Sequence, residues 1–181
     1  GFPQRNKEQS LQYALGCYYF EVTLSSGEDE TSFDQVRFWI SKAAEQGIAD
    51  AQKDLGVLYE ALDEDYSKAM EWYLKAAEQG NVDAQYKLGE SYFNGWDVEK
   101  DMEEAVKWFR KAAEQGNVDA INILGSYYLY GDGGGEIDYE EAVKLYRKVA
   151  EQGNADVQYE LGKSYFGLGV WYSCGWHGEL N

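Results

Sequence analysis

Apolar residues recur along the chain with the spacing of helices that bury one face. In residues 69–92 they fall at three- and four-residue intervals in two runs: Ala69, Trp72, Tyr73, Ala76 and Ala77, then Ala84, Leu88, Gly89 and Tyr92. Such spacing predicts two amphipathic helices. Gly80 fits the end of the first helix, because glycine takes a positive φ at little cost. Asn81 can cap the second helix. The stretch therefore predicts two helices joined by a tight turn.

The same pattern is repeated along the chain. The sequence Lys-Ala-Ala-Glu-Gln-Gly stands at 42–47, 75–80 and 111–116, with Val for the first Ala at 148–153. Leu-Gly recurs at 15–16, 55–56, 88–89, 124–125 and 161–162, and a tyrosine follows three residues after each of these glycines: Tyr19, Tyr59, Tyr92, Tyr128 and Tyr165. A glycine inside a helix costs about 1 kcal/mol relative to alanine, so its recurrence indicates close approach of a neighbouring helix. The pattern predicts an all-α solenoid with repeats at about 7–47, 48–80, 81–116, 117–153 and 154–166.

We expect nine helices in antiparallel pairs and no sheet. The repeated apolar positions predict a core with Leu55, Tyr59, Ala69, Trp72, Tyr73, Leu88, Tyr92, Ala105, Trp108, Leu124, Ala142, Tyr146 and Leu161, and with Trp39 beside them. The last repeat is incomplete, because Gly167-Leu168-Gly169 interrupts it and no second helix follows. Residues 167–181 match no repeat and predict a capping or irregular tail. Since each repeat buries its apolar surface against its neighbours, we expect Trp171 to cover the last helix, or that surface to form a homotypic contact.

The motifs Leu-Gly-x-x-Tyr and Ala-x-x-Trp-Tyr/Phe are close to the tetratricopeptide pattern. The terminal proline of that pattern is missing, and Ala-Ala-Glu-Gln-Gly-Asn-x-Asp-Ala stands in its place. With Tyr92, Gly95, Val98 and Asp101 at three-residue intervals, the variant resembles the Sel1-like repeat family over about residues 8–166. The resemblance implies a right-handed superhelix of helix pairs that acts as an adaptor or scaffold for other proteins.

The net charge of the chain disfavours some classes of binding partner. Its 181 residues include 33 acids against 16 lysines and arginines, for a net charge of −17. That sign disfavours binding to nucleic acids and anionic membranes, and no apolar run reaches the roughly 18 residues of a membrane span. The variable segments 20–35, 60–68, 93–104 and 129–141 together hold the whole acidic excess. Some of these acids stabilise helix N-termini, but an acidic edge is predicted from those expected outside helices: Glu28, Asp29, Glu30, Asp63, Asp132 and Glu136.

Positions that vary between repeats on the first helix of each pair are the candidate partner-binding residues. By analogy with tetratricopeptide arrays they line a concave groove: Tyr13 and Phe20, Lys53 and Glu60, Tyr86 and Phe93, Asn122 and Leu129, and Tyr159 and Phe166. Residues seven apart share a helix face, and aromatic side chains suit protein recognition. The alternative is that the phenylalanines pack between helices. Trp96, in an inter-helix loop, is a further candidate contact or lid residue.

Signals of catalysis or metal binding are sparse. His177 is the single histidine, and Cys174-Gly-Trp-His177 has the spacing of half a metal site without a second half. The glycine-rich segment 131–135 lacks the Gly-Lys-Ser/Thr of a phosphate-binding loop and the glycine and glutamate positions of a calcium loop. A flexible connection is favoured there. Cys17 and Cys174 belong to the first repeat and the tail, farther apart than the about 7 Å that a disulfide spans.

The sequence therefore predicts a non-enzymatic scaffold, without cofactor, that binds a protein or peptide in its groove and along its acidic edge. The partner is expected to carry a basic patch. A stoichiometric inhibitor or immunity protein for a toxin or enzyme is the alternative. An enzyme and a weak divalent-cation binder that uses the loop acids are disfavoured. The compartment stays open between the cytoplasm and, if the chain is processed, the periplasm or the outside of the cell.

Overall fold

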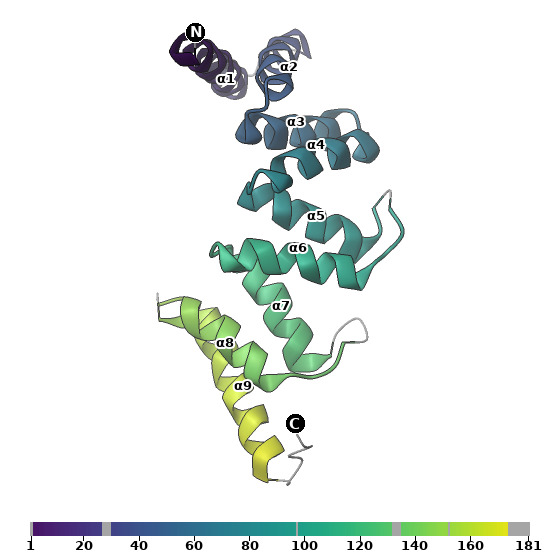
Figure 1. Cartoon of the computed structure of the whole chain (residues 1–181), viewed down its shortest axis with the longest axis vertical. Coiled ribbons are helices and arrows are strands. Elements are labelled where there is room, and N and C mark those ends of the chain that lie inside the picture. The colour runs from purple at the N-terminus through teal and green to yellow at the C-terminus, as the bar shows by residue number, and fades with distance from the viewer. Residues whose placement is uncertain (1, 27–29, 97, 132–134, 152, 174–181) are drawn as a thin grey trace. The chain divides into compact units, whose positions relative to one another are not determined.

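The computed structural model describes all residues except 1, 27–29, 97, 132–134, 152 and 174–181. This part of the chain forms nine α-helices and no β-strand (Figure 1). The helices are α1 (Phe2–Ser26), α2 (Glu30–Glu45), α3 (Ala49–Leu62), α4 (Tyr66–Glu78), α5 (Val82–Asn94), α6 (Met102–Glu114), α7 (Val118–Tyr130), α8 (Tyr139–Ala150) and α9 (Ala155–Ser173). The all-α succession expected from the repeats is confirmed for these residues.

The chain divides into two compact units. The N-terminal unit is residues 1–100 with α1–α5, and the C-terminal unit is residues 101–181 with α6–α9. Within each unit every helix packs against the next one along the chain. We call α1, α3, α5, α7 and α9 the first helices and α2, α4, α6 and α8 the second helices. Packing between consecutive helices is what stacked helix-pair repeats require.

The turns after α4, α6 and α8 use the predicted glycine and asparagine, whereas Ile48 follows the glycine after α2. Gly80 has a φ of 91°, in the left-handed region that favours glycine. The Oδ1 atom of Asn81 then accepts a hydrogen bond from the backbone N–H of Ala84 at 2.9 Å. Asn117 caps α7 in the same way, through the N–H of Ala120 at 2.8 Å. The predicted helix stop and helix cap are confirmed.

The glycine of the Leu-Gly motif allows a first helix to meet the second helix of its own repeat. A Cβ at Gly56 would lie 2.6 Å from Cε1 of Tyr73, and one at Gly125 would lie 2.1 Å from Cζ of Tyr146. Both rings therefore occupy space that any other residue would fill. At Gly162 of α9 nothing lies within 4 Å of that position, and no helix follows α9 among the described residues. The close approach predicted from the recurring glycine is confirmed at Gly16, Gly56 and Gly125.

The core agrees with the prediction in part. The predicted residues that are buried are Leu55, Ala69, Tyr73, Leu88, Ala105, Leu124, Ala142 and Tyr146. Those that are only half-buried are Trp39, Tyr59, Trp72, Tyr92, Trp108 and Leu161. The prediction of a buried position is wrong for this second group.

The physical reason is clearest at the tryptophans. The residue directly after each of them is the buried one, as with Tyr73 after Trp72 and Phe109 after Trp108. The neighbouring tryptophan is turned about 100° away around the helix. Its ring is covered by a lysine three residues later: the Nζ of Lys75 lies 3.8 Å from the ring centroid of Trp72. Trp72 and Trp108 therefore lie at the margin of the core, each beneath a lysine.

α9 is longer than the sequence predicts. It continues through Ser173, so residues 167–173 are helical and the interruption expected at Gly167 is wrong. A Cβ at Gly167 would lie 2.4 Å from Cε1 of Tyr139, so this glycine serves a close contact with α8. The side chain of Trp171 and residues 174–181 lie outside the described residues, and their role as a cover stays a prediction.

Candidate functional site

In the N-terminal unit, the candidate groove residues of α1 and α3 meet at Asp54. The hydroxyl of Tyr13 donates a hydrogen bond to Oδ2 of Asp54 at 2.8 Å. Lys53 forms an ion pair with Oδ1 of the same carboxylate. Burial, and then the hydrogen bond to Asp54, raise the pKa of Tyr13, so its hydroxyl stays protonated and acts as a donor. The structure thus brings together Tyr13 and Lys53, two residues predicted from separate repeats.

A second polar group joins α3, α4 and α5. The hydroxyl of Tyr73 donates to Oε2 of Glu60 at 2.5 Å. The Nζ of Lys87 lies 3.3 Å from Oε1 of Glu60 and 3.5 Å from Oε2 of Glu90. The hydroxyl of Tyr86 donates to Oε1 of Glu90 at 3.0 Å. Glu60 and Tyr86, again predicted from separate repeats, therefore belong to one network.

Trp96 lies next to this network. It is 44% exposed and lines a small hollow that Glu60 and Lys87 also line. Nearby, the Nζ of Lys100 lies 5.5 Å from the ring centroid of Phe93. This position is compatible with both roles predicted for Trp96, contact or lid.

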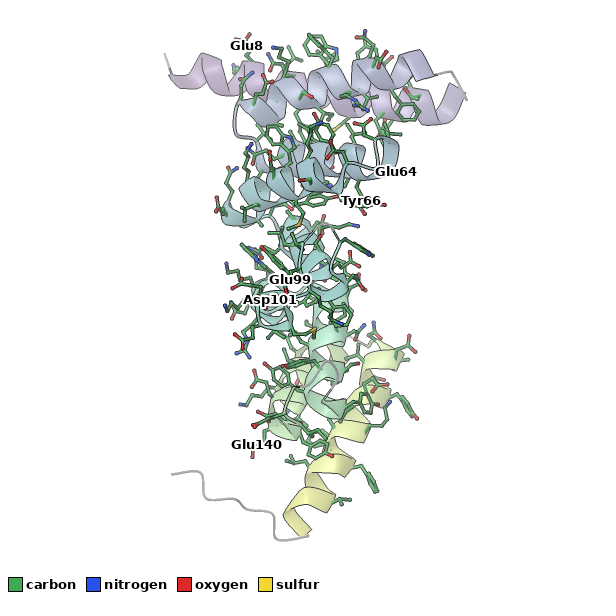
Figure 2. The ribbon with its side chains drawn as sticks, turned by 90° about the vertical axis from the view of Figure 1, so that its right-hand side faces the viewer. Glu8, Glu64, Tyr66, Glu99, Asp101 and Glu140 are labelled. Carbon is green, nitrogen blue, oxygen red and sulfur yellow. The ribbon has the colours of Figure 1, made fainter. Side chains whose placement is uncertain are left out.

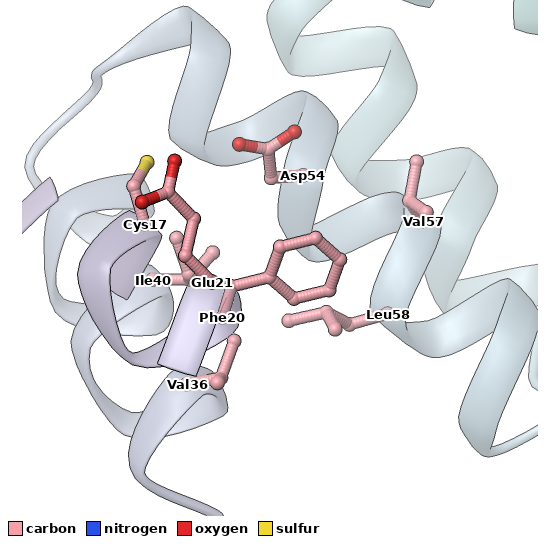
Figure 3. A pocket seen from close by; sticks show the side chains of 8 residues that line it. All are labelled: Cys17, Phe20, Glu21, Val36, Ile40, Asp54, Val57 and Leu58. Carbon is pink, nitrogen blue, oxygen red and sulfur yellow. The ribbon is translucent and has the colours of Figure 1, made fainter. Parts of the chain in front are cut away.

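A pocket of about 290 Å³ opens between α1, α2 and α3 (Figure 3). Its walls are Cys17, Phe20 and Glu21 of α1, Val36 and Ile40 of α2, and Asp54, Val57 and Leu58 of α3. The candidate groove residue Phe20 forms part of its wall and is 41% exposed. Burial raises the pKa of the Cys17 thiol, and the charges of Asp54 and Glu21 raise it further. The thiol is therefore protonated at neutral pH.

In the C-terminal unit the candidate groove residues differ sharply in exposure. Tyr159 and Phe166 of α9 are 68% and 75% exposed. Leu129 is buried, so the expectation that it lines an open groove is wrong. Asn122 is half-buried, and its backbone carbonyl accepts a hydrogen bond from Tyr146 at 3.3 Å. Unlike Leu129, the equivalent Phe166 belongs to a first helix that no described second helix follows.

Lys163 organises the exposed face of α9. Its Nζ lies 2.6 Å from Oε1 of Glu160, 4.8 Å from the ring centroid of Tyr159 and 5.2 Å from that of Tyr130. The hydroxyl of Tyr130 donates to Oε2 of Glu160 at 3.2 Å. The hydrogen bonds to Glu160 and then Tyr130 raise the pKa of Lys163, which stays charged. The face is therefore a cation set among aromatic rings.

The residues that complete these networks were not among the candidates. They are Asp54, Lys87, Glu90 and Lys163. Glu90 and Lys163 each follow a candidate groove residue by four positions and so lie on the same side of its helix. Asp54 and Lys87 each follow one by a single position, about 100° further around the helix. The selection from the sequence used pairs seven residues apart, and a search at four would have found Glu90 and Lys163.

The predicted acidic edge is only partly described. Two hydrogen bonds of 2.6 and 2.9 Å join Asp63 to the guanidinium of Arg37, and they lower the pKa of this carboxyl. Asp63 therefore links α2 to the end of α3. Glu136 is exposed ahead of α8. Glu30 begins α2, so the expectation that it lies outside a helix is wrong. Three members lie outside the described residues: Glu28, Asp29 and Asp132.

The described residues contain no group of three or more His, Cys, Asp or Glu side chains that could hold a metal ion. Among the same residues, no helix combines the length and apolarity needed to cross a membrane. Cys17 is a free thiol. The features that stand out in this part of the chain are thus exposed aromatic rings beside charged groups.

Comparison with known proteins connects this architecture to one repeat family. The Sel1 repeat matches residues 37–48, 49–81, 82–117, 118–154 and 155–177. The crystal structure of a protective antigen from uropathogenic Escherichia coli, with an SLR fold, is 35% identical with a TM-score of 0.77 over 90% of this chain. The match covers 35% of that protein, so the chain spans about a third of its length.

Two further solved structures extend the comparison. A Sel1 repeat protein from Oxalobacter formigenes is 34% identical with a TM-score of 0.74, over 91% of this chain and 67% of that one. An immunity protein from Pseudomonas aeruginosa is 23% identical with a TM-score of 0.36, over 80% of this chain and 68% of that one, which is too distant to bear on function. No curated protein matches.

Proposed function

The chain belongs to the Sel1 repeat family, whose repeats typically mediate protein–protein contacts, and from this premise we propose a specific role. The protein is a non-enzymatic scaffold that holds a protein or peptide on the exposed faces of its first helices. In the N-terminal unit that face belongs to α1, α3 and α5, and in the C-terminal unit to α7 and α9.

The observation that carries the proposal is the separation of constant from variable positions. Leu55 and Leu88, which the repeats share, are buried. Lys53, Tyr86 and Asn122, which occupy one repeat position with different side chains, are half-exposed on the first helices. A constant core that presents changing surface chemistry suits recognition of one partner among many, because specificity is set by a few surface residues.

The exposed aromatic residues of α9 support the same role. Tyr159 and Phe166 are two turns apart on one helix, and Lys163 lies between them in sequence. Exposed apolar patches rimmed by polar groups mark interaction surfaces, and aromatic residues are enriched at protein interfaces. Aromatic anchors of this kind supply most of the binding energy in protein interfaces.

The partner of this scaffold carries a basic patch. The chain has a net charge of −17, and complementary charge accelerates encounter while exposed charges are screened over about 8 Å at physiological ionic strength. Neutralising Glu28, Asp29, Asp132 and Glu136 together therefore slows association and leaves the melting temperature nearly unchanged. An acidic partner, or an association rate that ignores salt, would assign the acids to solubility alone.

Selection from a random peptide library on the full chain tests the function. We expect enriched peptides that combine Lys or Arg with aromatic residues and that bind more weakly as salt rises. The double variant Tyr159→Ser with Phe166→Ser, or the single variant Tyr86→Ala, should weaken binding. Leu74→Ser, which changes an exposed residue of the second helix α4, is the matched control.

The outcomes separate the candidates. Failure to enrich any peptide, or equal loss of binding in Leu74→Ser and the first-helix variants, would contradict the proposal. A partner that binds one-to-one and loses its own activity on binding would instead identify a stoichiometric inhibitor, which stays a prediction. If the purified chain itself converted a peptide into product, or converted the substrate of an enzyme bound to it, the non-enzymatic role would be contradicted.

A further inference from the structure

Repeat one departs from its neighbours at a buried position that borders the pocket between α1, α2 and α3. On the second helices this position holds Ile40 in repeat one, Tyr73 in repeat two, Phe109 in repeat three and Tyr146 in repeat four. All four side chains are buried. Only in repeat one does the position lack an aromatic ring.

The tyrosine of repeat two shows what that ring would fill. Tyr73 packs against Gly56, and its hydroxyl reaches onward to Glu60, four residues after that glycine. In repeat one, Ile40 packs against Gly16, where a Cβ would lie 2.6 Å from its Cδ1. Phe20 stands four residues after Gly16. Because isoleucine is shorter than an aromatic side chain, the space beyond Ile40, toward Phe20, remains as the pocket (Figure 3).

The apolar walls of this pocket are buried at its floor and exposed at its mouth. Val36, Ile40 and Leu58 are 1%, 3% and 7% exposed. Phe20 and Val57 are 41% and 38% exposed and lie nearer to solvent. An apolar cavity of about 150 Å³ accepts benzene, and this pocket measures about 290 Å³. An aromatic or large aliphatic side chain therefore fits, and would cover apolar surface that solvent now reaches.

The charged groups of the pocket are both acidic. They are Glu21 and Asp54, and among the described residues its lining contains neither Lys nor Arg. Both carboxylate oxygens of Asp54 already have partners, Tyr13 and Lys53. Glu21 is exposed, and Figure 3 shows its carboxylate close to the thiol of Cys17. The pocket thus combines an apolar floor with an exposed negative charge beside it.

We propose that this pocket receives one apolar side chain, preferably aromatic, from a partner protein segment in which a Lys or Arg lies directly beside it and pairs with Glu21. The inference rests on the proposed function, since it defines which segment of a basic partner the scaffold recognises. Ile40 is then the residue that gives repeat one a specificity the other repeats lack.

A fluorinated peptide tests the pocket directly. The probe is the capped pentapeptide Lys-Lys-Phe-Lys-Lys with fluorine on its phenylalanine, titrated with the full chain and followed by ¹⁹F NMR. Burial of a phenylalanine side chain contributes about 1.5–3 kcal/mol, so Lys-Lys-Ala-Lys-Lys should compete at least about tenfold less well than unlabelled Lys-Lys-Phe-Lys-Lys. Glu-Glu-Phe-Glu-Glu should compete less well too. The proposal would be overturned if Lys-Lys-Ala-Lys-Lys or Glu-Glu-Phe-Glu-Glu competed as well as Lys-Lys-Phe-Lys-Lys. It would also be overturned if the ¹⁹F signal of the probe did not shift when the chain is added.

Two variants locate the binding. Ile40→Phe introduces the residue found in repeat three and fills the pocket, so it should abolish the ¹⁹F shift without lowering the melting temperature. Glu21→Gln should weaken binding about two- to fivefold, the range for an exposed ion pair. Glu8→Gln is its control, because Glu8 is exposed on the same helix (Figure 2). The helical rise of about 1.5 Å per residue separates it from Glu21 by about 20 Å along the axis. If Ile40→Phe fails to fold, the test is whether the probe binds Glu21→Gln more weakly than Glu8→Gln. Equal binding of the probe by these two variants would overturn the pairing of Glu21 with a basic residue.

The design keeps the two proposals apart. Library peptides that bind the original chain and the folded Ile40→Phe variant equally would overturn the pocket and leave the scaffold role standing. Absence of binding by both the library peptides and the fluorinated probe would overturn both proposals.

Discussion

At Gly125 the ring of Tyr146 occupies the space that a Cβ would need, and at Gly162 the same helix position is open. Both glycines lie inside helices and belong to the same Leu-Gly motif. The intrinsic cost of glycine in a helix is therefore equal at the two sites, whereas the packing benefit exists at only one of them. The local packing, and not the motif, decides what a substitution does.

Replacing these two glycines by alanine should change stability in opposite directions. Gly125→Ala should destabilise by about 1–3 kcal/mol, because the added methyl group forces Tyr146 out of its position. Gly162→Ala should stabilise by about 0.5–1 kcal/mol through helix propensity alone. Urea unfolding followed by circular dichroism measures both. A loss of stability in Gly162→Ala would reveal a contact on that face of α9.

Adjacent aromatic residues on α6 should also differ. Phe109 is 1% exposed, so Phe109→Ala should cost about 3–5 kcal/mol. Trp108 is half-buried, and the Nζ of Lys111 lies 3.7 Å from its ring centroid, so Trp108→Ala should cost clearly less than Phe109→Ala. The same unfolding measurement compares them. An equal loss of stability in the two variants would show that Trp108 is a core residue, as the sequence pattern predicts.

At the scale of the element, α3, α5 and α9 are each joined to the preceding second helix by a glutamine of the first turn. Besides the asparagine cap, the buried Gln85 donates from Nε2 to the carbonyl of Ala77 at 3.1 Å. Gln52 and Gln158 donate in the same way, to Ala44 at 3.1 Å and to Ala150 at 3.0 Å. These bonds satisfy carbonyls at the end of the preceding helix, which have no partner within it. The turn is therefore held from both sides.

Removal of one cap should have a measurable cost. Asn117→Ala loses the hydrogen bond to the N–H of Ala120 and should destabilise the chain by about 1 kcal/mol. Asn117→Asp keeps a side-chain acceptor at the same place and should retain most of that stability. Thermal unfolding of the two variants makes the comparison. If both variants lose the same amount of stability, the amide nitrogen of Asn117 contributes more to stability than its oxygen does.

The sequence predicts these elements well because their determinants are local. Gly80 and Asn81 fix a turn through their own backbone and side-chain chemistry. The pattern could not decide whether Trp72 or Tyr73 points inward, since both lie on the apolar side of a helix with 3.6 residues per turn. It took Gly167 for an interruption because the need for glycine there comes from Tyr139, on another helix. The ion pair of Lys87 with Glu60 depends likewise on how α3 and α5 align, and the contact of Lys163 with the ring of Tyr130 depends on how α7 and α9 align.

At the scale of the whole molecule, the acidic excess has more than one role. Asp65, Asp101 and Asp138 belong to the variable segments, and the structure places each at a helix N-cap. Each accepts a hydrogen bond from the backbone N–H three residues later, at 3.0, 3.0 and 2.9 Å. Part of the charge is therefore structural. The remainder still leaves a chain that repels itself at low ionic strength.

The melting temperature should consequently rise with added salt. Between about 10 and 150 mM sodium chloride the Debye length shortens from about 30 to about 8 Å, which screens repulsion among acids more than it weakens close ion pairs. Differential scanning calorimetry at constant pH measures the change. A parallel series with a neutral osmolyte separates screening from exclusion effects. A melting temperature that falls with salt would show that the ion pairs outweigh the repulsion.

The contact between the Leu-Gly glycine and the ring opposite it has a consequence for how such proteins change over generations. Gly56 and Tyr73 lie in one repeat, and Gly125 and Tyr146 lie in another. A duplication or deletion of one whole repeat therefore carries both partners of the pair together. No compensating mutation is needed at this contact, because the small residue and the large one are inherited as a unit. The number of repeats can therefore change without loss of this contact. Each copy can in addition acquire a substitution, such as the one that placed Ile40 in repeat one, and with it a new specificity.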